Sequence, residues 1–141
     1  MRYPLYAGGV DIADQIAFLN ARLDEDEAAA KAATDGPWYA DGSEIRGHDR
    51  AYAGGEPDIL VVMHTWPQES AHIVRHDPAR VLREIEADRD LIAAYLACKA
   101  QLGSGDDTRW RAGQVDTLCD TIQRRAEIWS DHPDCPVTKE G

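Results

Sequence analysis

Long apolar segments and basic residues are both scarce in this chain, and each shortage excludes a class of protein. The longest apolar run, Ile59 to Met63, is far shorter than the roughly 20 residues that cross a bilayer, and residues 1–10 lack the apolar segment of a secretory signal. Lys and Arg number 15 against 26 Asp and Glu, which gives a net charge of −11. Such a chain repels nucleic-acid phosphates and anionic lipid. We therefore expect a cytoplasmic protein that binds neither membranes nor, directly, nucleic acid.

Paired cysteines and catalytic motifs are also missing. Cys98, Cys119 and Cys135 are odd in number and have no Cys-x-x-Cys spacing, which favours reduced thiols over a disulfide scaffold. The chain has no Gly-x-Ser-x-Gly motif and no dinucleotide fingerprint. Gly103-Ser104-Gly105 lacks the lysine and the preceding strand of a phosphate-binding loop, so it is typical of a linker. These absences weigh against an enzyme.

Apolar residues that are present recur at helical spacing, which predicts a packed core. With 141 residues and 43% hydrophobic composition, we expect one domain over 1–135 and a flexible tail over 136–141. The first helix is predicted over 11–33, capped by Asp11 and ended by a left-handed Gly36 before Pro37. Its apolar stripe is Ile12, Ile16, Leu19 and Leu23.

Two further long helices follow. Asp77-Pro78 predicts the start of a helix over 78–99, after a short helical turn over 70–76. The last helix is predicted over 114–130, with an earlier start near Thr108 left open. The stripe of the middle helix is Val81, Leu82, Ile85, Ile92, Tyr95 and Leu96, and that of the last helix is Val115, Leu118, Cys119, Ile122, Ala126 and Trp129.

The segment between the first two helices favours β-structure. Asp41-Gly42-Ser43 is typical of a hairpin turn joining strands over 38–40 and 44–46. The apolar centre of 59–66 predicts a third strand buried on both faces, and the polar loop before it is the segment expected to be most mobile. The fold class is therefore α+β, with three main helices packed on a small antiparallel β-sheet of two or three strands.

Three histidines form the main candidate for chemistry. His72 and His76 are four residues apart, so on a helix they share a face, as two imidazoles do in zinc sites. His132 could add a third ligand, with Asp131 or Asp134 nearby. Cys119 cannot join His132 if the last helix is continuous, because thirteen helical residues span about 20 Å. The structural alternative is that these histidines pack, hydrogen-bond or cap helices, and no cofactor is then needed.

A second candidate is a contact surface for an anion or a partner. Arg75 and Arg80 lie near a helix start, where backbone amides also favour negative charge. The alternative is that such arginines form solvated ion pairs with acids such as Glu84. Trp110, between Arg109 and Arg111, is predicted to be exposed, and an exposed aromatic flanked by arginines is typical of partner contacts.

Four stretches of the chain together resemble a known family. They are Ala32 to Trp38 with its Thr-x-Gly-Pro-Trp turn, the His-Ile-Val-Arg-His-Asp-Pro-Ala-Arg-Val-Leu segment from His72 to Leu82, Glu84 to Ala87, and the Cys119 region with Asp-His-Pro-Asp at 131–134. In that order they look like a family of small actinobacterial and actinophage proteins, domain-of-unknown-function family 6221. Its members often carry a cysteine pair before the last helix, where this chain has Cys98. The resemblance implies no established activity or cofactor.

Three functions remain open at this stage. The preferred one is a non-catalytic intracellular accessory or regulatory protein, from an actinobacterium or its phage, that binds a protein partner. The alternative is a zinc-binding protein or metal-dependent enzyme centred on His72, His76 and His132. A phage inhibitor that mimics DNA or binds a nucleotide signal is the third. The oligomeric state is open as well.

Overall fold

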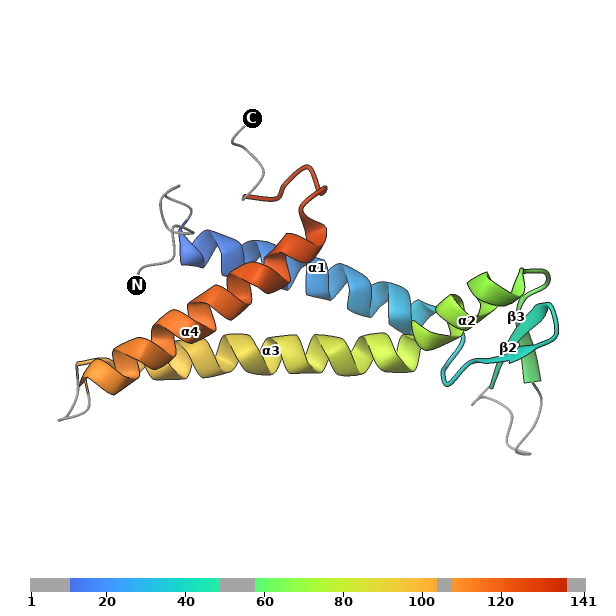
Figure 1. The fold of residues 1–141 in the computed structure, drawn as a ribbon, viewed down its shortest axis with the longest axis horizontal. Coiled ribbons are helices and arrows are strands. Elements are labelled where there is room, and N and C mark those ends of the chain that lie inside the picture. Colours follow the sequence, from blue (N-terminus) through green and yellow to red (C-terminus); the bar gives the residue numbers. More distant parts are fainter. Residues whose placement is uncertain (1–10, 49–57, 104–107, 137–141) are drawn as a thin grey trace. The chain divides into compact units, whose positions relative to one another are not determined.

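The computed structural model describes residues 11–48, 58–103 and 108–136 (Figure 1). These residues form four α-helices, one 3-10 helix and a three-stranded antiparallel sheet, which confirms the α+β class. None of these helices is long and apolar enough to span a membrane. The elements in order are α1 (Ile12–Ala32), β1 (Tyr39–Asp41), β2 (Glu44–His48), β3 (Asp58–Val62), α2 (Pro67–Arg75), α3 (Pro78–Ala100), α4 (Thr108–Ala126) and η2 (Glu127–Trp129).

The chain divides into two compact units, and α1 and α3 each contribute residues to both. The first unit runs to Leu23 and resumes at Ala87, and the second runs from Asp24 to Glu86. Most of the predicted tail, and residues 49–57 of the loop expected to be mobile, lie outside the described residues. The single domain over 1–135 stays a prediction.

The start of α1 follows its sequence signal. Asp11 accepts a hydrogen bond from the backbone N–H of Ala13 through its side chain, at 3.1 Å, and its carbonyl accepts from Asp14 and Gln15. Leu19 and Leu23 are fully buried, as the predicted stripe requires. The helix therefore begins where a short acidic side chain can satisfy an amide of the first turn.

Gly36 differs from its prediction. The glycines with positive φ among the described residues are Gly42 and Gly103, so a left-handed Gly36 is wrong. Close packing requires the glycine instead, because a Cβ at this position would lie 2.8 Å from Cβ of Ala79 and 2.9 Å from Oδ2 of Asp77. Gly36 thus lets the chain after α1 pass close to the start of α3.

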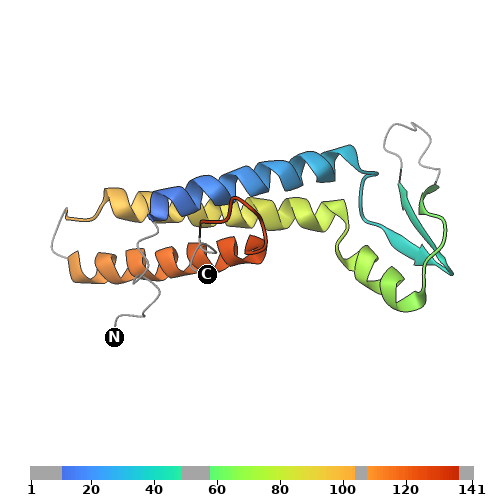
Figure 2. The same cartoon turned by 90° about the horizontal axis from the view of Figure 1, so that it is seen from above.

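The predicted hairpin is confirmed. Asp41 pairs with Glu44 at the end of β1 and β2, and Gly42 takes the left-handed conformation in the turn, at φ 60°. Glycine adopts this conformation without a steric penalty. Ile45 on β2 is fully buried, and α2 contacts β1 and β2, alongside the sheet in Figure 2.

The third strand differs from its prediction in length and burial. It ends at Val62, and the sheet order β1-β2-β3 places it at an edge among the described strands. Leu60 is exposed and Met63, just beyond the strand, is 73% exposed, so predicted burial on both faces is wrong. The sequence pattern of an apolar run cannot distinguish a strand that is buried on one face from a strand that is buried on both. In this sheet the fully buried residue is Ile45 on β2.

Asp77 organises the junction of α2 and α3. Helix α2 is longer than the predicted turn and has Pro67 at its start, and α3 begins at Pro78 as predicted. The buried Asp77 carboxylate accepts hydrogen bonds from the backbone N–H of Arg80 at 2.8 Å and of Trp38 at 2.9 Å. One side chain therefore caps α3 and fixes the chain that leads into β1.

In the first unit, a buried ion pair joins α3 to α4. Asp88 is 6% exposed, and Arg125 donates to its two oxygens from Nε at 2.6 Å and Nη2 at 2.7 Å. The predicted stripe of α3 includes Leu96, which is wrong, since Leu96 is 52% exposed, and it leaves out Asp88, which is buried. The last helix begins at Thr108, the earlier of its two predicted starts.

We predict that Gly36→Ala lowers the free energy of unfolding by about 1–3 kcal/mol, because the added methyl group overlaps Ala79 and Asp77. Gly113→Ala in α4 is the control, since an added Cβ there has no neighbour within 4 Å. It should raise stability by about 0.5–1 kcal/mol through helix propensity. Urea unfolding followed by circular dichroism measures both changes. A Gly36→Ala protein as stable as the wild type would refute this account.

Candidate functional site

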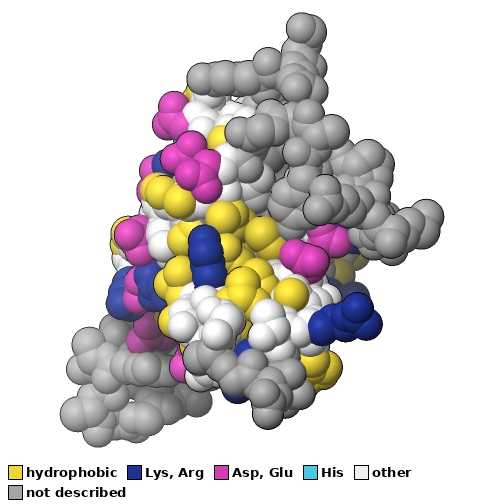
Figure 3. All heavy atoms as spheres, turned by 90° about the vertical axis from the view of Figure 1, so that its left-hand side faces the viewer, with side chains coloured by type: hydrophobic (Ala, Val, Ile, Leu, Met, Phe, Trp, Pro, Cys, Tyr) yellow, Lys and Arg dark blue, Asp and Glu magenta, His cyan; other side chains and the backbone are white. Residues whose placement is uncertain are grey.

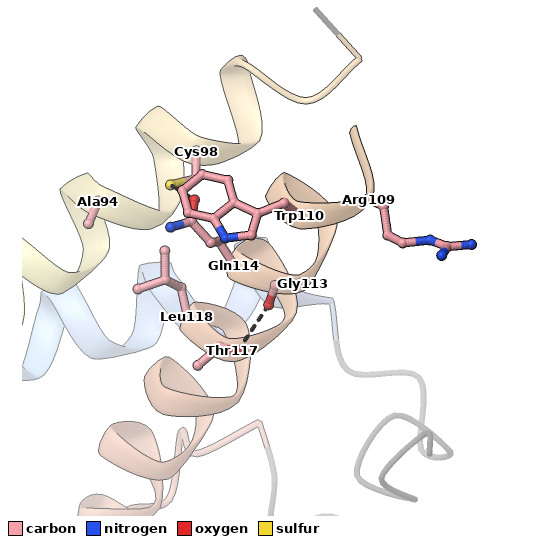
Figure 4. Close-up of a pocket in the computed structure, with 8 residues that line it drawn as sticks. All are labelled: Ala94, Cys98, Arg109, Trp110, Gly113, Gln114, Thr117 and Leu118. Atoms are coloured by element: carbon pink, nitrogen blue, oxygen red, sulfur yellow. Dashed lines mark hydrogen bonds between the residues drawn. The ribbon is translucent and has the colours of Figure 1, made fainter. Parts of the chain in front are cut away.

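An open groove of about 610 Å³ lies between α3 and α4 in the first unit (Figure 4). Two small side chains of α3 face it, and the remainder of the lining comes from α4. The lining residues are Ala94, Cys98, Arg109, Trp110, Gly113, Gln114, Thr117 and Leu118. The groove is therefore formed by one helical hairpin and needs no residue from the second unit.

The groove stays open because its lining is small and uncharged on the α3 side. From Leu91 to Cys98 this helix carries no charged residue, and Ile92 and Tyr95 turn into the core. Ala94 remains exposed. A helical segment with apolar residues on all sides is normally buried on all sides. Segment 91–98 of α3 is apolar throughout, and yet one of its sides is exposed among the described residues.

Trp110 is the largest side chain of the groove and is 65% exposed. Its indole extends from α4 across Cys98 and Gln114, with Leu118 deeper in the same groove (Figure 4). The Sγ of Cys98 lies 3.9 Å from Oε1 of Gln114. The predicted exposure of Trp110 is confirmed. It is not an isolated surface aromatic, because the other apolar lining residues lie beside it.

The polar side chains that line the groove contribute little to its surface, so the groove is largely apolar. The Thr117 hydroxyl donates to the carbonyl of Gly113, at 3.0 Å, within α4. Arg109 supplies the charge of the lining, and its side chain extends away from the groove floor (Figure 4). An apolar groove with one charged residue at its edge is the kind of surface on which a partner makes apolar contacts at the centre and charged contacts at the rim.

Basic residues cluster around this end of the hairpin. Arg111 donates from Nη1 to the carbonyl of Gln101 at 3.0 Å, and the ammonium of Lys99 lies 5.7 Å from the Tyr95 ring centroid. Residues 91–118, which include every residue of the lining, contain three basic and three acidic side chains, a net charge of zero against −11 for the whole chain. Two of the three acids, Asp106 and Asp107, lie outside the described residues. Figure 3 shows hydrophobic side chains gathered at this end, with Lys and Arg as well as Asp and Glu side chains around them.

His72 and His76 lie side by side on α2, as their spacing predicted. Their ring centroids are 4.3 Å apart, and both side chains are exposed. Nδ1 of His76 lies 2.8 Å from the carbonyl oxygen of His72, so this nitrogen is the donor and Nε2 is the nitrogen with a lone pair. The pair is thus one half of a possible metal site.

His132 belongs to the first unit and has other partners there. Its Nδ1 is 2.9 Å from Nη1 of Arg22, which also contacts Nε2, and accepts from the backbone N–H of Asp134 at 3.1 Å. Its ring meets that of Phe18 edge to face at 5.8 Å. A neutral imidazole has one acceptor nitrogen, so these donors compete with a metal for it.

No group of three or more His, Cys, Asp or Glu side chains that could hold a metal ion is found among residues 11–48, 58–103 and 108–136. His72 and His76 lie in the second unit and His132 in the first. The three-histidine zinc site therefore stays a prediction.

Arg80 forms an ion pair with Glu84, which is the alternative to an anion site that the sequence analysis left open. Its Nε donates to Oε1 of Glu84 at 2.7 Å, and its Nη1 donates to the carbonyl of Arg75 at 2.9 Å. Both partners of the ion pair are more than 40% exposed, so the pair contributes little to stability. Anion binding by Arg75 and Arg80 stays a prediction.

Sequence reasoning identified Trp110 but missed the groove. The signal available was the charge-free stretch from Leu91 to Cys98, in a chain of which 29% is charged. Helical periodicity assigned this stretch to the core without showing that one of its sides is left uncovered.

Comparison with known proteins gives one match. The model of a family of unknown function, DUF6221, matches residues 12–137. The chain belongs to this family. No curated protein and no solved structure matches it. The DUF6221 match covers both units, including α3, α4 and every residue that lines the groove.

We predict that the native DUF6221 chain has one readily modified thiol, Cys98. Cys119 and Cys135 are buried, whereas Cys98 is partly exposed and lines the same groove as Trp110. Maleimide labelling followed by mass spectrometry should find Cys98 modified first. Trp110→Ala should raise its labelling rate roughly several-fold, because removing the indole from the groove widens the access of the reagent to Cys98.

Trp66→Ala is the control for this labelling, since Trp66 is 70% exposed and belongs to the second unit. It should leave the rate unchanged. Faster labelling of Cys119 or Cys135 than of Cys98 would contradict the arrangement of α3 and α4.

Proposed function

We propose that this protein is a non-catalytic intracellular accessory or regulatory protein that acts by binding a protein partner in the α3–α4 groove. The observation that carries the proposal is the position of Trp110, largely exposed and yet part of an apolar, open groove. Aromatic side chains in such settings are over-represented among the residues that dominate binding energy.

Burying the exposed part of Trp110 under a partner would contribute substantially to the binding free energy. A tryptophan buries about 150–250 Å² when fully covered, and 65% of its side chain is exposed here. At about 25 cal/mol per Å², covering that area contributes about 2–4 kcal/mol. This is the magnitude that a central contact residue supplies in protein interfaces.

The groove is also fixed before any partner arrives. The Arg125–Asp88 pair holds α4 against α3, with Asp88 buried, and Arg111 holds the start of α4 to the carbonyl of Gln101. A preformed site loses less conformational entropy on binding than one that must first be ordered.

Affinity capture with matched tryptophan variants tests this proposal. Full-length wild-type protein, Trp110→Ala and Trp66→Ala are cross-linked in native lysate, and recovered proteins are quantified by mass spectrometry. We expect a partner that is retained by Trp66→Ala and reduced at least about tenfold by Trp110→Ala, the effect of a dominant contact residue. Partners retained equally by both variants would refute the proposal.

Zinc binding is the second candidate, and the contact between the His72 and His76 rings favours it. Nδ1 of His76 donates to a backbone carbonyl, and a hydrogen bond of this kind on one ring nitrogen orients the other nitrogen, Nε2, for binding a metal. The site would then hold a structural or catalytic ion.

Metal analysis of protein purified without a histidine tag tests this candidate. Zinc binding predicts one equivalent of metal by plasma mass spectrometry, and its loss in the His72→Ala/His76→Ala double variant. His64→Ala is the control, since His64 is also exposed and lies outside the pair. Metal-free wild-type protein that takes up no added zinc would exclude the site.

A further inference from the structure

We propose that the partner of the α3–α4 groove is an acidic amphipathic helix that inserts an apolar side chain beside Trp110. The inference rests on the proposed function and specifies the chemistry of the partner. It depends on three features of the groove, namely its length, the gap at Gly113 and the sign of its charge.

The length of the groove suits about two turns of helix. Its lining on α4 begins at Arg109, and the part from Trp110 to Leu118 is nine residues, whose eight rises span about 12 Å of helix. A third helix laid between two packed helices contacts them through residues at i, i+3, i+4 and i+7. Two turns supply three or four such residues, which matches the apolar length of the groove.

Gly113 leaves a gap that the protein itself does not fill. A Cβ on this residue would have no neighbour within 4 Å, and its φ is not in the left-handed region. Glycine in a helix interior destabilises the helix relative to alanine, and neither packing nor backbone conformation within the described residues requires it. An incoming side chain between Trp110 and Leu118 would use this space.

The charge of the groove selects an acidic partner. Arg109 is the charged residue of the lining, and among the residues that the structure describes, which leave out Asp106 and Asp107, no acidic side chain lines the groove. Arg111 and Lys99 lie on the same end of the hairpin. Acidic residues flanking the apolar face of a partner helix would meet these cations, whereas a basic helix would place like charges together.

A second copy of the chain fits less well. A twofold axis through the groove would bring the two Arg109 side chains toward one another. Self-association through this groove would therefore place like charges together at close range, whereas an acidic partner helix would place a carboxylate near Arg109.

Designed peptides and the full-length protein test the inference. The first is an 18-residue peptide with Leu at helical spacing and Glu on its other face. The second has the same composition without a helical stripe, and the third has Lys in place of Glu. Protein labelled with fluorotryptophan reports binding by ¹⁹F NMR, with the Trp110 resonance assigned from Trp110→Phe, and protection of Cys98 from maleimide gives an independent readout.

We expect the acidic striped peptide to shift the Trp110 resonance and to protect Cys98. The peptide without a stripe should do neither, and the basic peptide should bind at least about fivefold more weakly. Arg109→Glu should reverse the preference for acidic over basic peptide. Arg124→Glu is the matched control, because it makes the same charge change at an exposed position of α4 outside the groove, and it should leave the preference unchanged.

A variant with a larger side chain at Gly113 distinguishes an effect on peptide binding from an effect on protein stability. A Cβ at Gly113 would have no neighbour within 4 Å, and leucine has a higher helix propensity than glycine, so Gly113→Leu should leave the urea midpoint unchanged or raise it. Peptide affinity should fall at least about tenfold, because the space for the inserted side chain is lost. Unchanged affinity of Gly113→Leu would refute insertion beside Trp110.

The remaining outcomes distinguish this inference from the proposed function. Capture of a Trp110-dependent partner, with no binding of the acidic striped peptide, would overturn the inference and leave the proposed function standing. Failure of both experiments would overturn both. Equal binding of acidic and basic peptides would overturn the charge selection. A concentration-dependent dimer that buries Trp110 in sedimentation experiments would assign the groove to a second copy.

Discussion

The bidentate ion pair between Arg125 and Asp88 fixes the position of α4 on α3, and the candidate groove depends on that position. Asp88 is buried, so the loss of its partner would leave an uncompensated charge inside the first unit. Two parallel N–H···O bonds also define an orientation, which a point contact would not. The lateral gap between the two helices, where Trp110 lies, is a consequence of that fixed geometry.

In the second unit the buried carboxylate of Asp77 fixes the geometry in the same way. Asp77 binds the backbone N–H groups of Arg80 and Trp38, and the chain at Gly36 packs closely against it. Most acids of this chain are solvated and set its net charge. The geometry of each unit depends instead on one carboxylate that is removed from water and fully engaged, since a buried polar group is costly unless it is bonded.

The same physical features support the proposal that the chain acts through contact with a partner. Asp77 and Asp88, two of the polar side chains buried in the described residues, hold structural elements together. The groove at Trp110 has an apolar lining with small residues and one peripheral cation. Binding in such a groove draws on the burial of apolar area, with charge at its margin selecting among partners.

The sequence by itself determined the features that depend on near neighbours in the chain. The turn at Gly42, the start of α3 at Asp77-Pro78 and the exposure of Trp110 all followed from residues next to one another, and the family followed from ordered motifs. Only the tertiary structure decided that Asp88 is buried and Leu96 exposed, and that one side of α3 is left open as a groove. Periodicity shows which side of a helix is apolar, whereas coverage of that side depends on elements distant in sequence.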